Sequence, residues 1–377
     1  EEDHVFRRGG VGGFARCTVG GGDLEKSAGH EAHGVWRDED ACRRCGVGGG
    51  YGGLQRHGIL GSADEFAPHL SSLGCADRDD VPGKPDLLVL IDYPDFNWRL
   101  AKRAKALKIP VFSYIPPSAW AWRKGRAKSC ASLADEFAAI FPFETKVYEA
   151  AGANISFVGN PLIDTVHAEM EPEEARIHFG IGAEDVPILL MPGSRREEIE
   201  RLLPPMLGAA KILAAKDSAR RFFLPVAGGV DVAQIGRHLA ASSVDVTLAY
   251  DARYALMGIA RAAIAASGTV IMEAAIMGLP AVVLYRMSTL SYLIGRLLVD
   301  VPRFSLPNIL VGETFETELL QDAVQPERIA EAMERIIADG ADRVYVTERL
   351  ARAVALLGEP HAARRVAEKI LALAKRA

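Results

Sequence analysis

A carboxylate follows the first apolar strand that the sequence predicts. The run "DLLVLID" ends on Asp92, and Asp95 lies just before "FNWRLAKRAKAL", a segment typical of a helix. Asp95 is placed to cap that helix, which leaves Asp92 without a capping task. A carboxylate beyond the end of a strand could act as a general base toward a substrate hydroxyl. On these grounds alone, a catalytic and a structural aspartate are equally supported.

Two arginines stand at the start of a second predicted helix, in "MPGSRREEIE". Ser194 and Glu197 fit a capping box, which accounts for both of them. Arg195 and Arg196 oppose the helix dipole by about a few tenths of a kcal/mol each. A bound anion such as a diphosphate would reverse that sign. We therefore favour a ligand role for Arg195, while a solvent-facing position accounts for Arg196.

A tight turn between a strand and a helix opens "SGTVIMEAAIMGLP". Ser267, Gly268 and Thr269 would present free backbone N–H groups to a phosphate there. Glu273 lies four residues beyond Thr269, outside the capping-box register, in an otherwise apolar helix. A buried glutamate needs partners. A ribose diol and a structural salt bridge are equally open as those partners.

One further candidate at a strand exit is Asn308, in "RFSLPNILVG" after a short strand-like segment. An asparagine beside a proline is usually a turn residue. Taken alone, Asn308 therefore says little about function.

A loop in the first half of the chain combines tryptophans with cations and contains no acid. Its residues are Trp120, Trp122, Arg123, Lys124, Arg126 and Lys128. That composition suits an anionic lipid headgroup or a bilayer surface. The alternative is a packed tryptophan pair beside a solvated charged stretch. Nucleic-acid binding ranks third, because the net charge of the chain is -5.

Length and composition indicate a globular protein with two domains. A chain of 377 residues is long for a single core, and 49% hydrophobic with 25% charged residues excludes a disordered one. No stretch is typical of a signal peptide, and the longest apolar run contains Glu273, Gly278 and Pro280. The five cysteines indicate no disulfide framework. We expect a soluble cytoplasmic protein, with peripheral membrane contact left open.

Apolar strands alternate with helices from Pro85 onward, in two successive series. Continuous hydrophobicity in the strands predicts parallel sheets covered on both faces. The sequence thus predicts an α/β fold with two doubly wound, Rossmann-like domains facing each other across a cleft. We place the remainder of the N-terminal domain at 81–165 and the C-terminal domain at 166–355. A helix over 356–377 is a candidate to pack back on the N-terminal domain.

Residues 1–80 are irregular and rich in glycine, cysteine and histidine. A zinc-type ligand set, His30, His33, Cys42 and Cys45, has the reverse order of a common finger and lacks the flanking apolar residues that would form a small core. We therefore predict no metal site there. Excess glycine, arginine, cysteine and histidine is typical of GC-rich DNA translated in the wrong frame. Our hypothesis is that much of this segment is out of frame.

Seven motifs from Pro85 to the C-terminus resemble, in the same order, those of lipid-A-disaccharide synthases, glycosyltransferases of the GT-B type. They are "IDYPDFN", "SAWAWR", "FPFE", "FVGNPLID", "MPGSRREEI", "SGTVIMEAAIMGLPAVVLYR" and "SLPNIL". The resemblance implies transfer of 2,3-diacylglucosamine from UDP to 2,3-diacylglucosamine 1-phosphate, with inversion, a β-1,6 bond and release of UDP. It implies no metal and no cofactor. The expected location is the cytoplasmic face of the inner membrane of a Gram-negative bacterium, with a homodimer as one option.

The resemblance also assigns roles to the candidate residues. Asp92 becomes the general base for the acceptor 6-hydroxyl, and Arg195 stabilises the leaving diphosphate. The UDP-binding loop and helix comprise Ser267, Gly268, Thr269 and Glu273, with Glu273 on the ribose. Asn308 lies at the nucleotide end of the cleft.

The chain departs from the family pattern in two places. Asn160 stands where the family most often has histidine, so no role is carried over to it. Residues 1–80 lack the opening strand and the GExSGD-type loop, which leaves the activity of this chain open. Two rival functions are a UDP-N-acetylglucosamine 2-epimerase, which would not need the basic tryptophan loop, and an inactive UDP-binding remnant.

Overall fold

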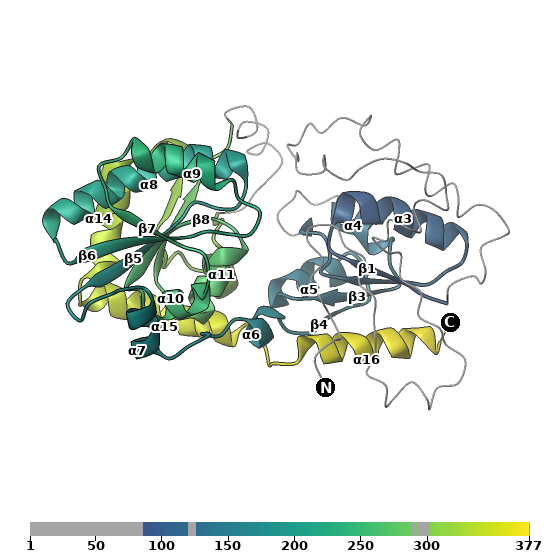
Figure 1. Cartoon of the computed structure of the whole chain (residues 1–377). Coiled ribbons are helices and arrows are strands. Elements are labelled where there is room, and N and C mark those ends of the chain that lie inside the picture. Colours follow the sequence, from purple (N-terminus) through teal and green to yellow (C-terminus); the bar gives the residue numbers. More distant parts are fainter. Residues whose placement is uncertain (1–85, 120–125, 289–291, 293–301, 377) are drawn as a thin grey trace, which may run out of the picture. The chain divides into compact units, whose positions relative to one another are not determined.

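The computed structural model describes residues 86–119, 126–288, 292 and 302–376, which fold as two units (Figure 1). In the described ranges, the first unit holds 86–119, 126–139, 144–158 and 363–376. The second unit holds 140–143, 159–288, 292 and 302–362. Some sequence predictions lie outside the described residues: the irregular segment 1–80 with its zinc-type set, and Trp120, Trp122, Arg123 and Lys124. Arg126 begins a helix, but its side chain is not described.

The first unit contains a parallel sheet of four strands in the order β1-β2-β3-β4. The strands are β1 (Leu88–Ile91), β2 (Val111–Tyr114), β3 (Glu136–Ala139) and β4 (Ile155–Phe157). The helices are α3 (Pro94–Ala106), α4 (Arg126–Ala131), α5 (Pro142–Glu149) and α16 (Ala362–Ala374). Every residue of β2 and β3 is buried, as expected for strands covered on both faces.

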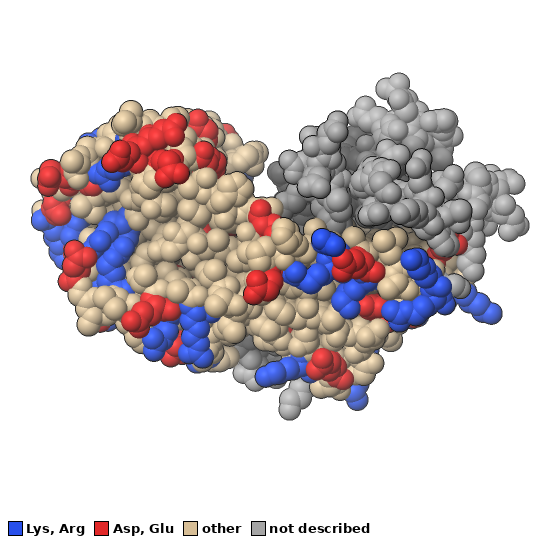
Figure 2. Space-filling model, turned by 90° about the horizontal axis from the view of Figure 1, so that it is seen from below, with Lys and Arg blue, Asp and Glu red and all other residues tan. Residues whose placement is uncertain are grey.

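Helix α16 joins the chain's end to this first sheet. Lys369 lies 3.2 Å from the buried carboxylate of Glu136, and Arg365 donates to the carbonyl of Val158 at 2.8 Å. Figure 2 shows lysine and arginine side chains, interspersed with acidic ones, on the face that carries α16. The C-terminal helix of the sequence is therefore a basic, amphipathic helix of this unit.

The second unit contains six parallel strands in the order β10-β9-β8-β5-β6-β7. They are β5 (Val186–Met191), β6 (Arg220–Pro225), β7 (Val246–Ala249), β8 (Ala262–Ala266), β9 (Ala281–Tyr285) and β10 (Glu318–Leu320). The chain starts in the middle with β5, proceeds to the edge at β7, and returns to build outward from β8. This is the strand order of a doubly wound dinucleotide-binding fold. The predicted parallel α/β sheets are thus confirmed.

Helices cover both faces of the second sheet. The helical segments of this unit are α6 (Leu162–Thr165), α7 (Pro172–His178), α8 (Arg196–Lys216), α9 (Val232–Ala240), α10 (Arg253–Ile259), α11 (Thr269–Ile276), α13 (Leu306–Val311), the 3-10 turn η5 (Gln321–Ala323), α14 (Pro326–Ile337) and α15 (Ala341–Ala355). Figure 1 shows α8 and α9 on one side of the sheet and α7 and α10 on the other. Ile188 and Leu190 pack in one apolar cluster, Leu189 and Met191 in the other. This double burial explains the continuous apolar strand sequence.

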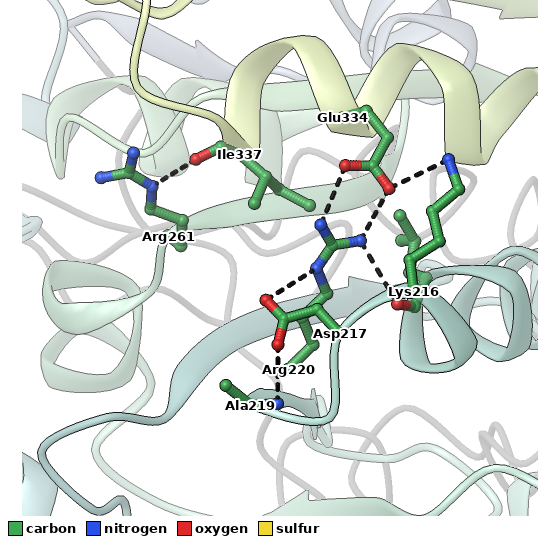
Figure 3. Close-up of polar contacts among 8 residues, drawn as sticks. Lys216, Asp217, Ala219, Arg220, Arg261, Glu334 and Ile337 are labelled. Carbon is green, nitrogen blue, oxygen red and sulfur yellow. Dashed lines mark hydrogen bonds and ion pairs between the residues drawn. The ribbon is translucent and has the colours of Figure 1, made fainter.

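A network of ion pairs joins α8, β6 and α14 at the amino-terminal edge of this sheet (Figure 3). Arg220, whose side chain is 9% exposed, donates to both oxygens of Glu334, at 2.7 and 2.8 Å. Lys216 approaches the same carboxylate at 3.2 Å. The hydrogen bond from Arg220, followed by that from Lys216, lowers the pKa of Glu334 despite opposing burial. The network lies opposite the edge at which the strands end.

Candidate functional site

The second sheet has its topological switch point between β5 and β8, its two central strands. Ligands of open parallel sheets bind outside the carboxyl ends of the strands at such a point. Met191 of β5 and Ala265 of β8 are register partners, so the two strand ends lie side by side. Immediately beyond them come the turn at Gly193–Arg195 and the turn at Ser267–Thr269. The fold therefore brings two of the sequence-predicted motifs to one edge.

Arg195 is the N-cap residue of α8, and the capping partner is Glu198. The backbone N–H of Arg195 donates to Glu198 Oε2 at 3.3 Å, and its guanidinium lies 2.6 Å from Oε1. The predicted capping box of Ser194 with Glu197 is wrong by one residue, because the helix begins at Arg196. The Arg195 side chain is 77% exposed and is thus accessible to an anion.

Gly193 permits this arrangement. Its φ is +101°, a conformation that side-chain-bearing residues rarely adopt. A Cβ atom at this position would lie 2.4 Å from Glu198 Oε2. The positive φ therefore favours glycine in the "PGSR" motif, and a methyl group here would also displace the Glu198 side chain.

Tyr285, at the end of β9, is a site residue that the sequence analysis missed. Burial raises the pKa of its phenol, the Glu198 charge raises it further, and Arg195 partly offsets this. The phenol therefore stays protonated near the Arg195–Glu198 pair. Its ring lies 5.8 Å from that of Phe304. An aromatic residue at the exit of a strand neighbouring the switch point was the available signal.

The turn at Ser267–Thr269 is tied to its neighbours through Ser267. The Ser267 N–H donates to Leu284 O at 2.8 Å, and its hydroxyl donates to Phe304 O at 3.1 Å. Helix α11 starts at Thr269 and has no side-chain cap at Gly268. The Ile271 N–H donates to Gly268 O at 3.3 Å, whereas those of Thr269 and Val270 have no partner among the described residues. Free N–H groups at a helix start suit a phosphate.

Glu273 is 5% exposed in α11 and pairs with Arg253. The guanidinium donates to Oε1 of Glu273 at 3.3 Å and lies over the ring of Tyr254, 4.6 Å from its centroid. Burial lowers the pKa of Arg253, but the Tyr254 hydrogen bond and the Glu273 charge outweigh it and raise the pKa. A structural ion pair therefore exists. The second oxygen of Glu273 accepts no hydrogen bond within the described ranges, so a ribose contact stays a prediction.

Asn308 lies inside helix α13, not after a strand-like segment as predicted. Its side chain is fully buried. The amide donates to Glu316 O at 2.9 Å and Glu318 Oε1 at 2.8 Å, and it accepts from Phe315 N and Glu316 N at 3.0 Å each. All donors and acceptors of the amide are thereby used. A direct ligand contact would break one of these bonds.

Asp92 follows β1 of the first unit directly and is exposed. Its φ is +51°, uncommon for a residue with a side chain and a frequent feature of functional sites. Asn97 Nδ2 donates a hydrogen bond to the backbone carbonyl of Asp92 at 2.6 Å. No described residue donates to the side-chain carboxylate of Asp92. The Asp92 carboxylate is thus available to a substrate.

The predicted helix cap beside Asp92 is wrong. Helix α3 begins at Pro94 with Tyr93 as N-cap, so Asp95 falls in its first turn. Proline prefers the first helical position because its φ is already helical and its missing N–H is not needed there. Asp95 is therefore not the cap of α3, and a cap at Asp95 no longer supports a catalytic role for Asp92. The support for Asp92 is instead its positive φ and the lack of a described donor to its carboxylate.

Asn160 has a structural explanation within the second unit. It is 1% exposed, its Oδ1 accepts from Leu162 N at 3.0 Å, and its N–H donates to Leu357 O at 2.9 Å. These bonds account for a buried asparagine without a ligand.

The described residues offer neither a cluster of metal ligands nor a membrane-spanning helix. Within these ranges, no three His, Cys, Asp or Glu side chains are grouped in a way that could hold a metal ion. None of the described helices has the length and apolar character needed to span a bilayer.

Comparisons with known proteins converge on one family. A sequence model described as lipid-A-disaccharide synthetase matches residues 80–372. The lipid-A-disaccharide synthase of Syntrophus aciditrophicus is 44% identical over 294 residues, covering 78% of this chain and 77% of the relative. That of Geobacter metallireducens is 43% identical over 287 residues, covering 76% and 75%.

Solved structures show the same GT-B fold. The UDP-GlcNAc 2-epimerase of Neisseria meningitidis bound to UDP-GlcNAc has a TM-score of 0.57 at 17% identity, covering 84% of each chain. The calicheamicin glycosyltransferase CalG4 has a TM-score of 0.52 at 17% identity, covering 83% of this chain and 80% of that one. Identity this low shows the fold alone, so the epimerase likeness carries no functional weight beside the synthase relatives. The resemblance read from the seven motifs is confirmed: this chain belongs to the lipid-A-disaccharide synthase family.

Proposed function

We propose that this chain is an inverting glycosyltransferase that joins UDP-2,3-diacylglucosamine to 2,3-diacylglucosamine 1-phosphate and releases UDP. The observation that carries the proposal is the edge between β5 and β8. There an exposed arginine at the start of α8 adjoins the uncapped start of α11, in a chain of this family. A UDP-sugar donor and a glycosyl acceptor follow from family membership.

In the donor half of the reaction, the diphosphate is the leaving group. The bond from the anomeric carbon to the diphosphate oxygen breaks, and negative charge develops on that oxygen. Arg195 and the N–H groups of the Ser267–Thr269 turn and α11 stabilise this charge. Glu273 accepts hydrogen bonds from the ribose through its unpaired oxygen, while Arg253 holds the other.

In the acceptor half, Asp92 is the general base. Its carboxylate takes the proton of the 6-hydroxyl as that oxygen attacks the anomeric carbon from the side opposite the diphosphate, which inverts the configuration. The lack of any donor to this carboxylate among the described residues supports this role. Asp92 belongs to the first unit and Arg195 to the second.

The experiment supplies both diacylated sugars to the full chain and measures UDP release and disaccharide formation. Asp92→Asn should lower turnover by at least about 100-fold while UDP binding is unchanged. Glu149→Gln, which neutralises another exposed carboxylate of the same unit, should match the parent. Unchanged turnover in Asp92→Asn refutes the base assignment. Turnover of UDP-GlcNAc alone would support an epimerase, and UDP binding without any disaccharide would support a remnant.

The membrane role belongs to the same proposal. The loop with Trp120, Trp122, Arg123, Lys124 and Arg126 contacts anionic lipid at the inner-membrane surface, where the acylated substrates reside. Arg123→Gln combined with Lys124→Gln should reduce binding to vesicles containing phosphatidylglycerol and leave binding to phosphatidylcholine vesicles unchanged. Equal binding of parent and variant to both vesicles refutes this role. Light scattering tests the homodimer option.

A further inference from the structure

Glu318, the first residue of β10, binds a segment that lies next to the switch-point edge. Its Oε1 accepts from Ser305 N at 2.9 Å and from Asn308 Nδ2 at 2.8 Å. Its Oε2 accepts from Phe304 N at 3.0 Å. One carboxylate therefore fixes the backbone at the start of α13 and the asparagine inside it.

The segment held by Glu318 contacts the nucleotide side of the edge directly. Phe304 O accepts the hydroxyl hydrogen of Ser267 at 3.1 Å, and the Phe304 ring packs 5.8 Å from that of Tyr285. Ser267 opens the turn whose N–H groups face the edge. A continuous series of contacts thus leads from β10, through Phe304, to the turn after β8.

A second carboxylate lies behind this series. Glu316 is 1% exposed, and its Oε2 lies 3.0 Å from Ser305 Oγ. Burial raises the pKa of Glu316 to about 8, against smaller lowering by hydrogen bonds, while the Glu318 charge raises it further. Glu316 is therefore mostly neutral at neutral pH. Its neighbour Glu318 is the carboxylate that accepts hydrogen bonds from the backbone N–H groups of Phe304 and Ser305.

We propose that Glu318 is a positioning residue of the nucleotide site: it fixes the Phe304 carbonyl, which orients Ser267 and the turn that receives the diphosphate. The inference rests on the proposed function, since it assumes that UDP binds at the β5–β8 edge. Glu318 itself touches no substrate in this arrangement. The rival is a purely structural cap of α13, which would alter stability without altering affinity for UDP.

Glutamine is the informative replacement because it keeps the shape of glutamate. Both oxygens of Glu318 accept from N–H donors, so an amide nitrogen must face at least one N–H group. The charge that strengthens all three bonds is also lost. The segment at Phe304 should then shift, and the Ser267 turn with it.

The test titrates the full chain with UDP by calorimetry, well below its unfolding midpoint. Glu318→Gln should weaken UDP binding by about tenfold, as loss of charge-assisted hydrogen bonds predicts. The control Glu331→Gln removes a carboxylate from an exposed helical ion pair and should bind UDP like the parent. A folded Glu318→Gln chain with parental affinity overturns the inference. Absence of UDP binding in the parent overturns the proposed function instead.

A double-mutant cycle with Ser267→Ala tests the route through Phe304. If Glu318 acts through Ser267, the double variant should bind UDP no more than about twofold more weakly than the weaker single variant, because contacts on one path are not additive. Fully additive losses overturn the route.

Hydrogen exchange on the parent decides the matter if Glu318→Gln does not fold. UDP should slow amide exchange in residues 302–310 together with residues 266–270. Protection of 266–270 with unchanged exchange in 302–310 would overturn the inference.

Discussion

Arg195 and Glu198 form an ion pair of 2.6 Å within the first turn of α8. The pair holds the guanidinium at the switch-point edge, where the N–H groups of Thr269 and Val270 at the start of α11 have no partner among the described residues. An exposed pair of this kind contributes little to stability, about 0.2–1 kcal/mol. The pair therefore matters less for stability than for keeping the positive charge of Arg195 at the switch-point edge.

Arg195→Gln should separate this role from general charge loss. We expect UDP binding to weaken by at least about tenfold, since a charged contact to a phosphate is lost. Arg196→Gln is the matched control, because Arg196 is exposed and adjacent in sequence. Calorimetric titration of both variants with UDP measures the difference. If both variants lost the same UDP affinity, the effect of Arg195→Gln would be explained by the change in net charge alone.

Gly193→Ala should disturb the same turn sterically. The added methyl group meets Glu198 Oε2, and φ at this position is positive. We expect a loss of unfolding free energy of about 1–3 kcal/mol and weaker UDP binding. Gly236→Ala, in the interior of α9 with open space around it, should be neutral or stabilising by up to about 1 kcal/mol. Urea unfolding of both variants provides the measurement, and a Gly193→Ala chain as stable as the parent contradicts the steric argument.

The strands and the edge that carries the site could be predicted from the sequence. Runs such as "PILLM" are buried on both faces, which leaves a continuous apolar signal, and parallel strands place their exits at one edge. Arg195 and Ser267 were found because an arginine and a tight turn stood just beyond such runs. These signals come from residues that are neighbours in the sequence, so they do not depend on how side chains pack in the folded protein.

Register and distant contacts could not be predicted in the same way. The cap residues at Asp95 and Ser194 were each misassigned, because Pro94 and Gly193 set the start of their helices through backbone conformation. Glu318 carried no local signal in the sequence. Glu318 acquires its role from Phe304 and Ser305, which the chain brings to it only in the folded state.

Glu316 should give the stability of the protein a distinctive dependence on pH. Its folded pKa of about 8 lies above the ordinary value of 4.5, chiefly because it is buried. Between these two values the folded state binds the proton more tightly than the unfolded state. The contribution is therefore complete below pH 4.5 and is lost as the pH rises through about 8, amounting to a few kcal/mol at most, on the order of magnitude that linkage gives.

Glu316→Gln should remove this dependence, because the amide is neutral throughout. Urea unfolding at about pH 5.5 and pH 8.5 should show a smaller loss of stability at the higher pH in the variant than in the parent. Glu331→Gln, at an exposed position, should lose as much unfolding free energy between these two pH values as the parent. Identical slopes in the parent and Glu316→Gln would mean that Glu316 is ionised in the folded state at neutral pH.

Arg220 should be a major source of stability in the second unit. Removal of one partner of a buried ion pair leaves an uncompensated charge and costs about 3–5 kcal/mol. Because the Glu334 side chain is 28% exposed, we expect Arg220→Ala to lose about 2–3 kcal/mol of unfolding free energy. Arg335→Ala, which breaks an exposed pair within α14, should lose at most about 0.5 kcal/mol.

Arg220 lies at the amino-terminal edge of its strand, far along the sheet from the exits, so UDP affinity of the folded Arg220→Ala chain should equal that of the parent. A comparable loss in both variants would show that the network of Figure 3 adds nothing beyond an ordinary surface pair.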